Sequence, residues 1–399
     1  MNEPVHTAED HLVHEAIGRD LTPVQAGAAI GLGVVSLIVA GVLPALLGAL
    51  EDEMRLSAAG IGLAATLEAL TMAISTGLAS AFLPPRRLRL IGVVASLLLA
   101  ALDFAGIGLH ENGILAVRTA AGLPEGILLW ITVAMIVRSE VPERWAGVLF
   151  MCSTSAQFVL ALAFAFWVIP RFGADGGMIA LGLSTLPGVA IALFCPERFA
   201  DLPGSEGGAG IPPLRGLIAL LATIVFVAAG AAVAIYLQPL AHEAGLSADV
   251  ARTAIWVSLG AQIAGSAAAT VLAGHLRYLT AFLLTTAVLL GVWFVFSQHV
   301  PAWAFIAANT LGGAVSLFIA PFLVPMTIEA DPSRKAAAQS AGAQLFATAM
   351  GPLFASWFVS DTDVHGALWL GAALLLAGMA MIAGLHLMAV RRGSAEQVA

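Results

Sequence analysis

Charged side chains are scarce in this chain and are absent from long parts of it. Only 11% of the 399 residues are Asp, Glu, Lys or Arg, whereas 60% are hydrophobic and the mean hydropathy is +0.95. A soluble domain of this composition would expose more apolar surface than water tolerates. The charges crowd into gaps between apolar stretches of about 20 residues, which is the length that a bilayer requires of a helix. Because such runs are too long for barrel strands, the sequence predicts an all-α membrane protein.

Cysteine, clustered histidine and nucleotide-binding motifs are also missing. The two cysteines, Cys152 and Cys195, lie near the ends of predicted spans, which argues against a disulfide framework or a cysteine metal site. The nine histidines lie in loops, tails or near span ends, so no metal cluster or histidine relay is visible. No Walker sequence is present, and the glycines lie within spans, where helix packing explains them better than phosphate binding. We therefore expect no metal, no cofactor, no nucleic-acid partner and no enzymatic activity.

Twelve apolar stretches predict twelve transmembrane helices. They cover residues 24–49, 57–83, 88–108, 113–137, 146–169, 176–195, 214–238, 250–273, 279–297, 301–328, 336–359 and 366–390. The first 20 residues are polar and acidic and lack the basic start of a cleaved signal peptide, so we expect the first span to be retained.

The basic residues predict the orientation. If the N-terminus is cytosolic, 13 Lys and Arg residues lie in cytosolic segments and only three, Arg55, Arg171 and Arg252, lie in outer loops. This asymmetry favours cytosolic termini and an even number of spans. We expect a multi-pass protein of the cell membrane, the inner membrane if the source is bacterial. We also expect it to be a monomer in the lipid bilayer.

The spans divide into two halves of six. The polar segment 196–213 contains LPGSEGGAG, a flexible linker composition, and separates a bundle at 24–195 from a bundle at 214–390; cytosolic tails cover 1–23 and 391–399. Loop residues recur at an offset of 190, as when Leu56-Ser57-Ala58 reappears as Leu246-Ser247-Ala248. This offset predicts two pseudo-symmetric six-helix bundles, with a substrate site near the midplane where they meet.

Two motifs carry a family resemblance. The fourth span reads VRTAAGLPEGILLW, with Arg118, Gly122 and Gly126 four residues apart, and the second cytosolic loop ends in RRLRLIG. Through these motifs, and over essentially its whole length, the chain resembles the major facilitator superfamily of secondary transporters. Ala81 stands where the family signature has an aspartate, so the latch made by that aspartate is not expected. The resemblance implies transport by alternating access between the two bundles.

Four ionisable side chains lie well inside the predicted spans: Glu68, Asp103, Arg118 and Glu125. Each costs about 2.5–3.5 kcal/mol on insertion scales and so needs a role. Arg118 and Glu125 share a helix face but lie about 10 Å apart along it, so we expect them not to pair without water, substrate or another partner. Glu68 and Glu125 lie near the midplane, where two carboxylates favour reversible proton loading.

Two interpretations of these charges stand side by side. In the functional one, Glu68 or Glu125 takes up and releases a proton in an aqueous passage, and Arg118 alternates between carboxylate and substrate. In the structural one, Arg118 and Asp103 form an ion pair that holds the bundle together, and a protonated Glu68 hydrogen-bonds across a helix interface.

Uncharged polar and aromatic side chains complete the candidate substrate site. With Arg118, the residues expected to contact substrate are Ser36, Trp130, Gln157, Tyr236, Gln238, Trp256, Gln262, Asn309 and Gln344. The second half offers no charge at depth, which suggests a solute with one polar or anionic group and an apolar body.

The sequence therefore predicts a secondary active transporter for a small organic solute, coupled to protons and powered by their gradient. Symport of an organic anion or a similar metabolite is one reading. The alternative is proton-coupled efflux of drugs or metabolites, although the fifth span lacks the G-x-x-x-G-P pattern of such antiporters. A membrane-embedded receptor or enzyme is the remote alternative.

Overall fold

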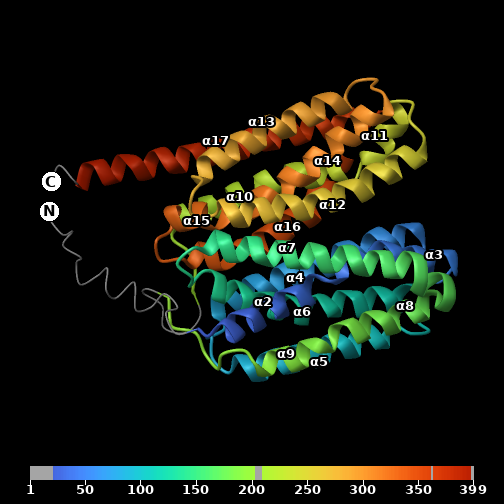
Figure 1. The fold of residues 1–399 in the computed structure, drawn as a ribbon, viewed down its shortest axis with the longest axis horizontal. Helices are drawn as coiled ribbons and strands as arrows, with labels where there is room; N and C mark the ends of the chain where they lie inside the picture. The colour runs from blue at the N-terminus through green and yellow to red at the C-terminus, as the bar shows by residue number, and fades with distance from the viewer. Residues whose placement is uncertain (1–20, 203–208, 361–362, 397–399) are drawn as a thin grey trace.

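The computed structural model describes residues 21–202, 209–360 and 363–396, and its long helices run along one axis in two adjacent bundles (Figure 1). The first bundle contains α2 (Pro23–Leu37), α3 (Val39–Asp52), α4 (Ala58–Phe82), α5 (Leu88–Ala105), α6 (Glu111–Ile136), α7 (Pro142–Ala163), the π-helical turn η1 (Phe164–Val168), α8 (Ile169–Thr185) and α9 (Pro187–Leu193). We call it the N-bundle.

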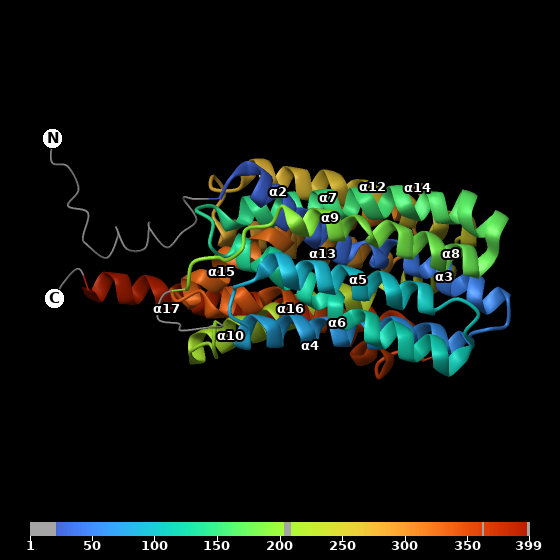
Figure 2. The same cartoon turned by 90° about the horizontal axis from the view of Figure 1, so that it is seen from below.

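The second bundle, the C-bundle, repeats this arrangement. It contains α10 (Leu214–Ala234), α11 (Leu237–Glu243), α12 (Ala248–Leu272), α13 (Tyr278–Phe296), α14 (Ala302–Ile319), the 3-10 turn η2 (Ala320–Phe322), α15 (Leu323–Ala330), α16 (Lys335–Ser356) and α17 (His365–Glu396). Figure 2 shows from a second side that the long helices are aligned along the same axis. The predicted fold class, all-α with two six-span bundles, is confirmed.

Ten stretches of the described residues are long and apolar enough to cross a membrane, fewer than the twelve predicted. One of them, Pro142–Leu193, has 52 residues, about 78 Å if straight, whereas the hydrocarbon core is about 30 Å thick. Gly173 interrupts it with φ +64° and ψ −164°, a conformation that only glycine adopts easily, so this stretch accounts for the fifth and sixth spans. The remaining span is α16, which has 22 residues but a more polar sequence.

Close backbone approach joins α4 to α6. A Cβ atom added at Gly126 would lie 2.6 Å from the Met72 carbonyl oxygen, so only glycine allows this contact. The hydroxyls of Thr71 and Ser75 donate hydrogen bonds of 2.8 Å to the carbonyl oxygens of Thr119 and Leu123. The fourth-span glycine motif therefore serves helix packing, as small residues do between helices in membranes.

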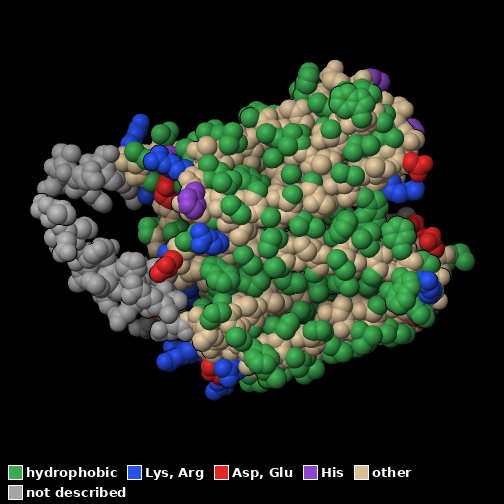
Figure 3. Space-filling view, viewed as in Figure 1, with side chains coloured by type: hydrophobic (Ala, Val, Ile, Leu, Met, Phe, Trp, Pro, Cys, Tyr) green, Lys and Arg blue, Asp and Glu red, His purple; other side chains and the backbone are tan. Residues whose placement is uncertain are grey.

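Apart from apolar contacts such as those of Trp256 with Phe158 and Phe166, polar contacts join the two bundles at the end of the molecule where α2 begins and α17 finishes, which we call the terminal end. There the Arg334 guanidinium donates a hydrogen bond of 3.3 Å to the Ser139 carbonyl oxygen, and the Gly274 amide donates one of 3.1 Å to the Glu143 carboxylate. Figure 3 shows Lys and Arg side chains gathered mainly at this end.

Candidate functional site: a neutral cavity and a sealed charge cluster

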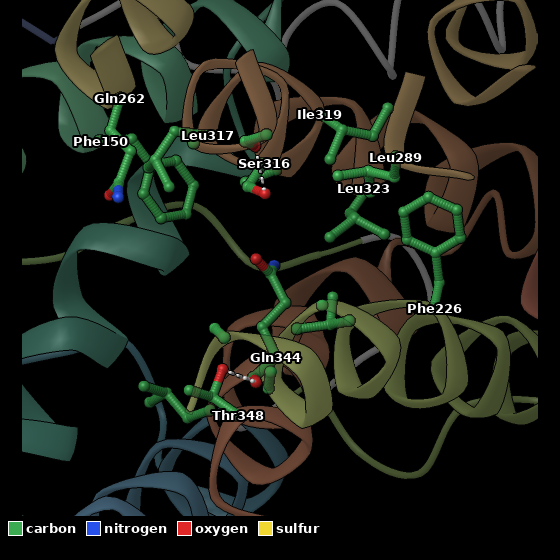
Figure 4. A pocket seen from close by; sticks show the side chains of 18 of the residues that line it. Phe150, Phe226, Gln262, Leu289, Ser316, Leu317, Ile319, Leu323, Gln344 and Thr348 are labelled. Atoms are coloured by element: carbon green, nitrogen blue, oxygen red, sulfur yellow. Dashed lines mark hydrogen bonds between the residues drawn. The ribbon is translucent and has the colours of Figure 1, made fainter. Parts of the chain in front are cut away.

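A cavity of about 520 Å³ lies between the two bundles. The N-bundle contributes Leu37 of α2 and side chains from the second half of α6 and the first half of α7. The C-bundle contributes residues of α10 to α16 and of η2. Figure 4 shows Gln344 projecting into its open centre, between Phe150 on one side and Phe226 on the other. Its position between two pseudo-equivalent bundles is the one predicted for a substrate site.

Few polar groups in the cavity are free to bind a ligand. The hydroxyls of Ser316, Ser340 and Thr348 donate to carbonyl oxygens of their own helices. The Asn309 amide nitrogen donates a 2.9 Å hydrogen bond to the Ala254 carbonyl oxygen. The side-chain amides of Gln262 and Gln344 make no hydrogen bond to any described residue, and both are drawn in Figure 4 within the cavity wall. Together with the Ser258 hydroxyl, they are the cavity's side-chain donors that no described residue engages.

The cavity wall carries no ionisable side chain among the described residues. Its lining consists of Leu, Val, Ile, Ala, Phe, Trp, Gly, Ser, Thr, Asn and Gln. Neither a fixed cation nor a fixed anion is therefore present to neutralise a charged solute.

The four predicted intramembrane charges meet elsewhere, inside the N-bundle. The Arg118 guanidinium on α6 forms an ion pair with Asp103 of α5, with 2.8 Å between Nη1 and Oδ1. It also pairs with both carboxylate oxygens of Glu68 on α4, 2.9 Å separating Nε from Oε2. Glu125 lies further away, with 3.8 Å between Arg118 Nη2 and Glu125 Oε1. We call these four residues the charge cluster.

The charge cluster is sealed from solvent in this conformation. Its four residues are between 0% and 3% exposed, and none of them lines the cavity. Thr185 of α8 donates a further hydrogen bond of 3.2 Å to Asp103. Glu125 Oε2 is buried without a hydrogen-bond partner among the described residues. The cluster thus has one cation, three carboxylates and one buried oxygen that nothing satisfies.

Two expectations about these charges are wrong. Arg118 and Glu125 were expected to be too far apart to pair, yet the long arginine side chain reaches along its own helix to within 3.8 Å of the carboxylate. The charges were also expected to face an aqueous passage, whereas the structure buries all four between α4, α5 and α6. The ion pair of Arg118 with Asp103, the structural interpretation, is present.

The cavity collects three of the ten residues expected to contact substrate: Gln262, Asn309 and Gln344. The other seven side chains lie elsewhere. Ser36 and Gln157 donate hydrogen bonds to the carbonyl oxygens of Glu125 and Leu37. Trp130 and Tyr236 pack in the N-bundle and C-bundle cores, and Trp256 contacts Phe158 and Phe166. Gln238 is exposed, and Arg118 is in the charge cluster.

The sequence reasoning missed the apolar wall of the cavity, including Phe150, Phe226 and Trp293. No local signal distinguishes such residues from core, because both are apolar residues at helical spacing. It also missed a possible ligand set outside the spans: oxygen and nitrogen atoms of Glu243, Asp363 and His365 lie within 4.8 Å of one another. These groups are paired, since the His365 imidazole is 3.1 Å from both carboxylates.

The likeness to solved structures decides the fold. Against the human organic anion transporter MFSD10 (TETRAN), the TM-score is 0.71 with 13% identity over 91% of this chain and 100% of that one. The chain has the major facilitator superfamily fold. The E. coli fucose:proton symporter FucP, in its outward conformation, gives 0.68 with 13% identity over 90% and 98%. The proton:xylose symporter XylE gives 0.65 with 14% identity over 90% and 94%.

No family model and no curated protein matches the sequence. The sequence resemblance is nevertheless confirmed at the level of the fold, which accounts for nine-tenths of the chain. The chain is therefore a multi-pass membrane protein with the major facilitator fold.

Proposed function

We propose that this protein is a secondary transporter that moves a small organic solute through the cavity by alternating access. The observation that carries the proposal is an apolar cavity between two six-span bundles that are joined at the terminal end. In this scheme the bundles rock about the bound solute, and the contacts of Arg334 and Glu143 across the bundle boundary break when the terminal end opens. The proposal places the protein in the cell membrane, as a monomer with cytosolic termini.

The proposed energy source is the proton gradient, with the charge cluster as the proton site. One guanidinium neutralises one carboxylate, so three ionised carboxylates would leave two uncompensated negative charges in a dry interior. Such a state is costly, and a bound proton removes part of the cost. Glu125 is the proposed carrier, because it is the carboxylate furthest from Arg118 and has an unsatisfied oxygen. Transport driven in this way by a proton gradient needs no cofactor.

The helix α6 offers a physical link between proton and solute. Glu125 and the cavity residue Leu129 are four residues apart on this helix, a rise of about 6 Å along one face. The backbone carbonyl oxygen of Glu125 accepts a 2.9 Å hydrogen bond from Ser36 of α2. A change of charge at Glu125 can therefore alter how α6 packs against α2 and α4, and with it the cavity wall.

Proteoliposomes that contain trapped pyranine test both parts of this proposal. A pH gradient is imposed and biphenyl-4-carboxamide, biphenyl-4-carboxylate or biphenyl-4-methanaminium is added outside. A proton-coupled carrier dissipates the pH gradient faster when its solute is present. Each transport cycle moves protons with the solute, and solute that returns passively through the lipid can be transported again.

The decisive variant is Glu125→Gln, compared with Glu140→Gln at an exposed loop position. We expect Glu125→Gln to lose solute-dependent proton flux and Glu140→Gln to keep it. Wild-type flux in Glu125→Gln would exclude this residue as the carrier.

Between the two directions of coupling, the cavity favours efflux of apolar compounds over symport of an organic anion. The observation behind this preference is the neutral cavity wall, which offers no partner for a carboxylate. The direction in which the added solute drives protons distinguishes antiport from symport.

A further inference from the structure

The ionisable side chains of the charge cluster do not line the cavity, and this restricts the class of solute that the cavity can bind. The four residues of the charge cluster lie behind the cavity wall, and Arg118 is engaged by Glu68 and Asp103 at a fully buried position. A charged solute in the cavity would lose its hydration without gaining an opposite charge. Burial of an unpaired ion is among the most unfavourable events in a protein interior.

The number of free hydrogen-bonding groups narrows the ligand class further. Only the side chains of Gln262, Gln344 and Ser258 make no hydrogen bond within the described wall, whereas Asn309 and the Ser316, Ser340 and Thr348 hydroxyls each donate one and keep mainly acceptor capacity. A sugar has a hydroxyl on nearly every carbon, and each one left without a partner on burial costs binding free energy. The cavity therefore does not fit a sugar, although sugar symporters share its fold.

We propose that the cavity selects an uncharged, largely apolar solute that carries one or two hydrogen-bonding groups, with the Gln262 and Gln344 amides as its polar anchors. The aromatic side chains of Phe150, Phe226 and Trp293 supply the apolar surface. An amide anchor both donates and accepts, so it serves a neutral amide, alcohol or ketone equally. This inference rests on the proposed function only in taking the bound solute to be the transported one.

Three biphenyls that share one skeleton separate charge from shape: the neutral 4-carboxamide, the anionic 4-carboxylate and the cationic 4-methanaminium. Their binding to the purified full-length protein in detergent is measured by calorimetry. We expect the carboxamide to bind at least tenfold more tightly than either ion.

A cavity-filling variant shows that the measured binding is in the cavity. Gly230 lines the cavity, and a Cβ atom added there meets nothing within 4 Å, so Gly230→Leu fills space without displacing backbone. Gly291 is equally unobstructed but lies on an exposed face of α13 away from the cavity, so Gly291→Leu is the matched control. We expect carboxamide binding to fall at least tenfold in Gly230→Leu and to remain unchanged in Gly291→Leu.

The polar anchor has its own test. Replacement of Gln344 by Leu removes one hydrogen bond, so carboxamide affinity falls about fivefold whereas unsubstituted biphenyl is unaffected. Equal effects on both compounds would indicate a change of shape rather than loss of an anchor, and would overturn the role of Gln344.

Other outcomes overturn the inference or isolate it from the proposed function. Tighter cavity binding by either ion, or carboxamide binding that Gly230→Leu does not weaken, contradicts the assigned ligand class. If the carboxamide binds as expected but no biphenyl drives proton flux in proteoliposomes, the transport proposal fails and the ligand class stands. If the carboxylate drives more flux with the protein than in protein-free liposomes, which its neutral acid form crosses unaided, transport stands and the ligand class fails.

Discussion

Removal of the Arg118 guanidinium is the most severe single change that the structure allows us to predict. Arg118→Met keeps most of the side-chain volume but leaves Glu68, Asp103 and Glu125 without a cation in a site where all are at most 3% exposed. Removal of one partner of a buried ion pair costs about 3–5 kcal/mol, because the charges left behind are uncompensated. For a unit the size of the N-bundle, each kcal/mol lowers the melting temperature by about 2–4 °C. We therefore expect a fall of roughly 6–20 °C.

The assay is thermal unfolding of the purified protein in detergent, with Arg252→Met as the control. Arg252 pairs with Asp249 at 3.3 Å, but both side chains are more than two-thirds exposed. Exposed pairs of this spacing contribute about 0.3–0.5 kcal/mol, so the control should shift by no more than about 2 °C. If Arg118→Met unfolds within the range of the control, the charge cluster does not hold the N-bundle together and the reasoning is refuted.

The remaining predictions concern packing, specificity and the closed terminal end. Gly126→Ala forces α4 away from α6 and costs about 1–3 kcal/mol of unfolding free energy, whereas Gly62→Ala, where a Cβ meets nothing within 4 Å, is stabilising or neutral in the same thermal assay. Gln262→Lys gives the cavity a cation, so calorimetry should show new binding of biphenyl-4-carboxylate and loss of the tenfold preference for carboxamide. Arg334→Gln removes a contact between bundles, so a cysteine at Ala341 in the cavity should react several-fold faster with a maleimide supplied from the terminal end.

The spans could be predicted from the sequence because charged residues are so costly in lipid that nearly all of them lie in the loops. Breaks within spans were less visible. Pro187 opens α9 and Pro321 lies within η2, and neither break inside its span was predicted, whereas the break at Gly173 falls in the predicted gap between residues 169 and 176. The merged stretch of 52 residues and the more polar α16 account for the difference between the ten apolar stretches of the structure and the twelve spans that the sequence predicts.

The depth of the charges could also be predicted, but their environment could not. Helical rise placed Glu68 and Glu125 at one level, and the structure brings both to Arg118. Whether that level faces water or protein depends on which faces of α4, α5 and α6 pack together. Those faces are set by Gly122 and Gly126, whose small size draws α4 close enough to bury its carboxylate.

The apolar cavity escaped prediction for a different reason. Gln262 and Gln344 could be noticed as polar residues in spans, but the residues around them have no feature that separates a cavity wall from a core. Only the arrangement of both bundles shows that Leu129 and Phe226 face open space rather than each other. Polar residues such as Gln157 and Ser36, equally noticeable in the sequence, are used for hydrogen bonds between helices.

The most direct test of the central claim, that a sealed proton site serves a separate neutral cavity, is proton exchange on solute binding. Biphenyl-4-carboxamide is added to the purified protein in weakly buffered detergent solution near neutral pH, and the change in pH is recorded while binding is followed by calorimetry. We predict a measurable exchange of protons by the wild-type protein and none by Glu125→Gln, whose carboxamide affinity should no longer change with pH, because proton and solute binding are reciprocally linked. Undiminished proton exchange in Glu125→Gln, or binding without any proton exchange in the wild type, would contradict it.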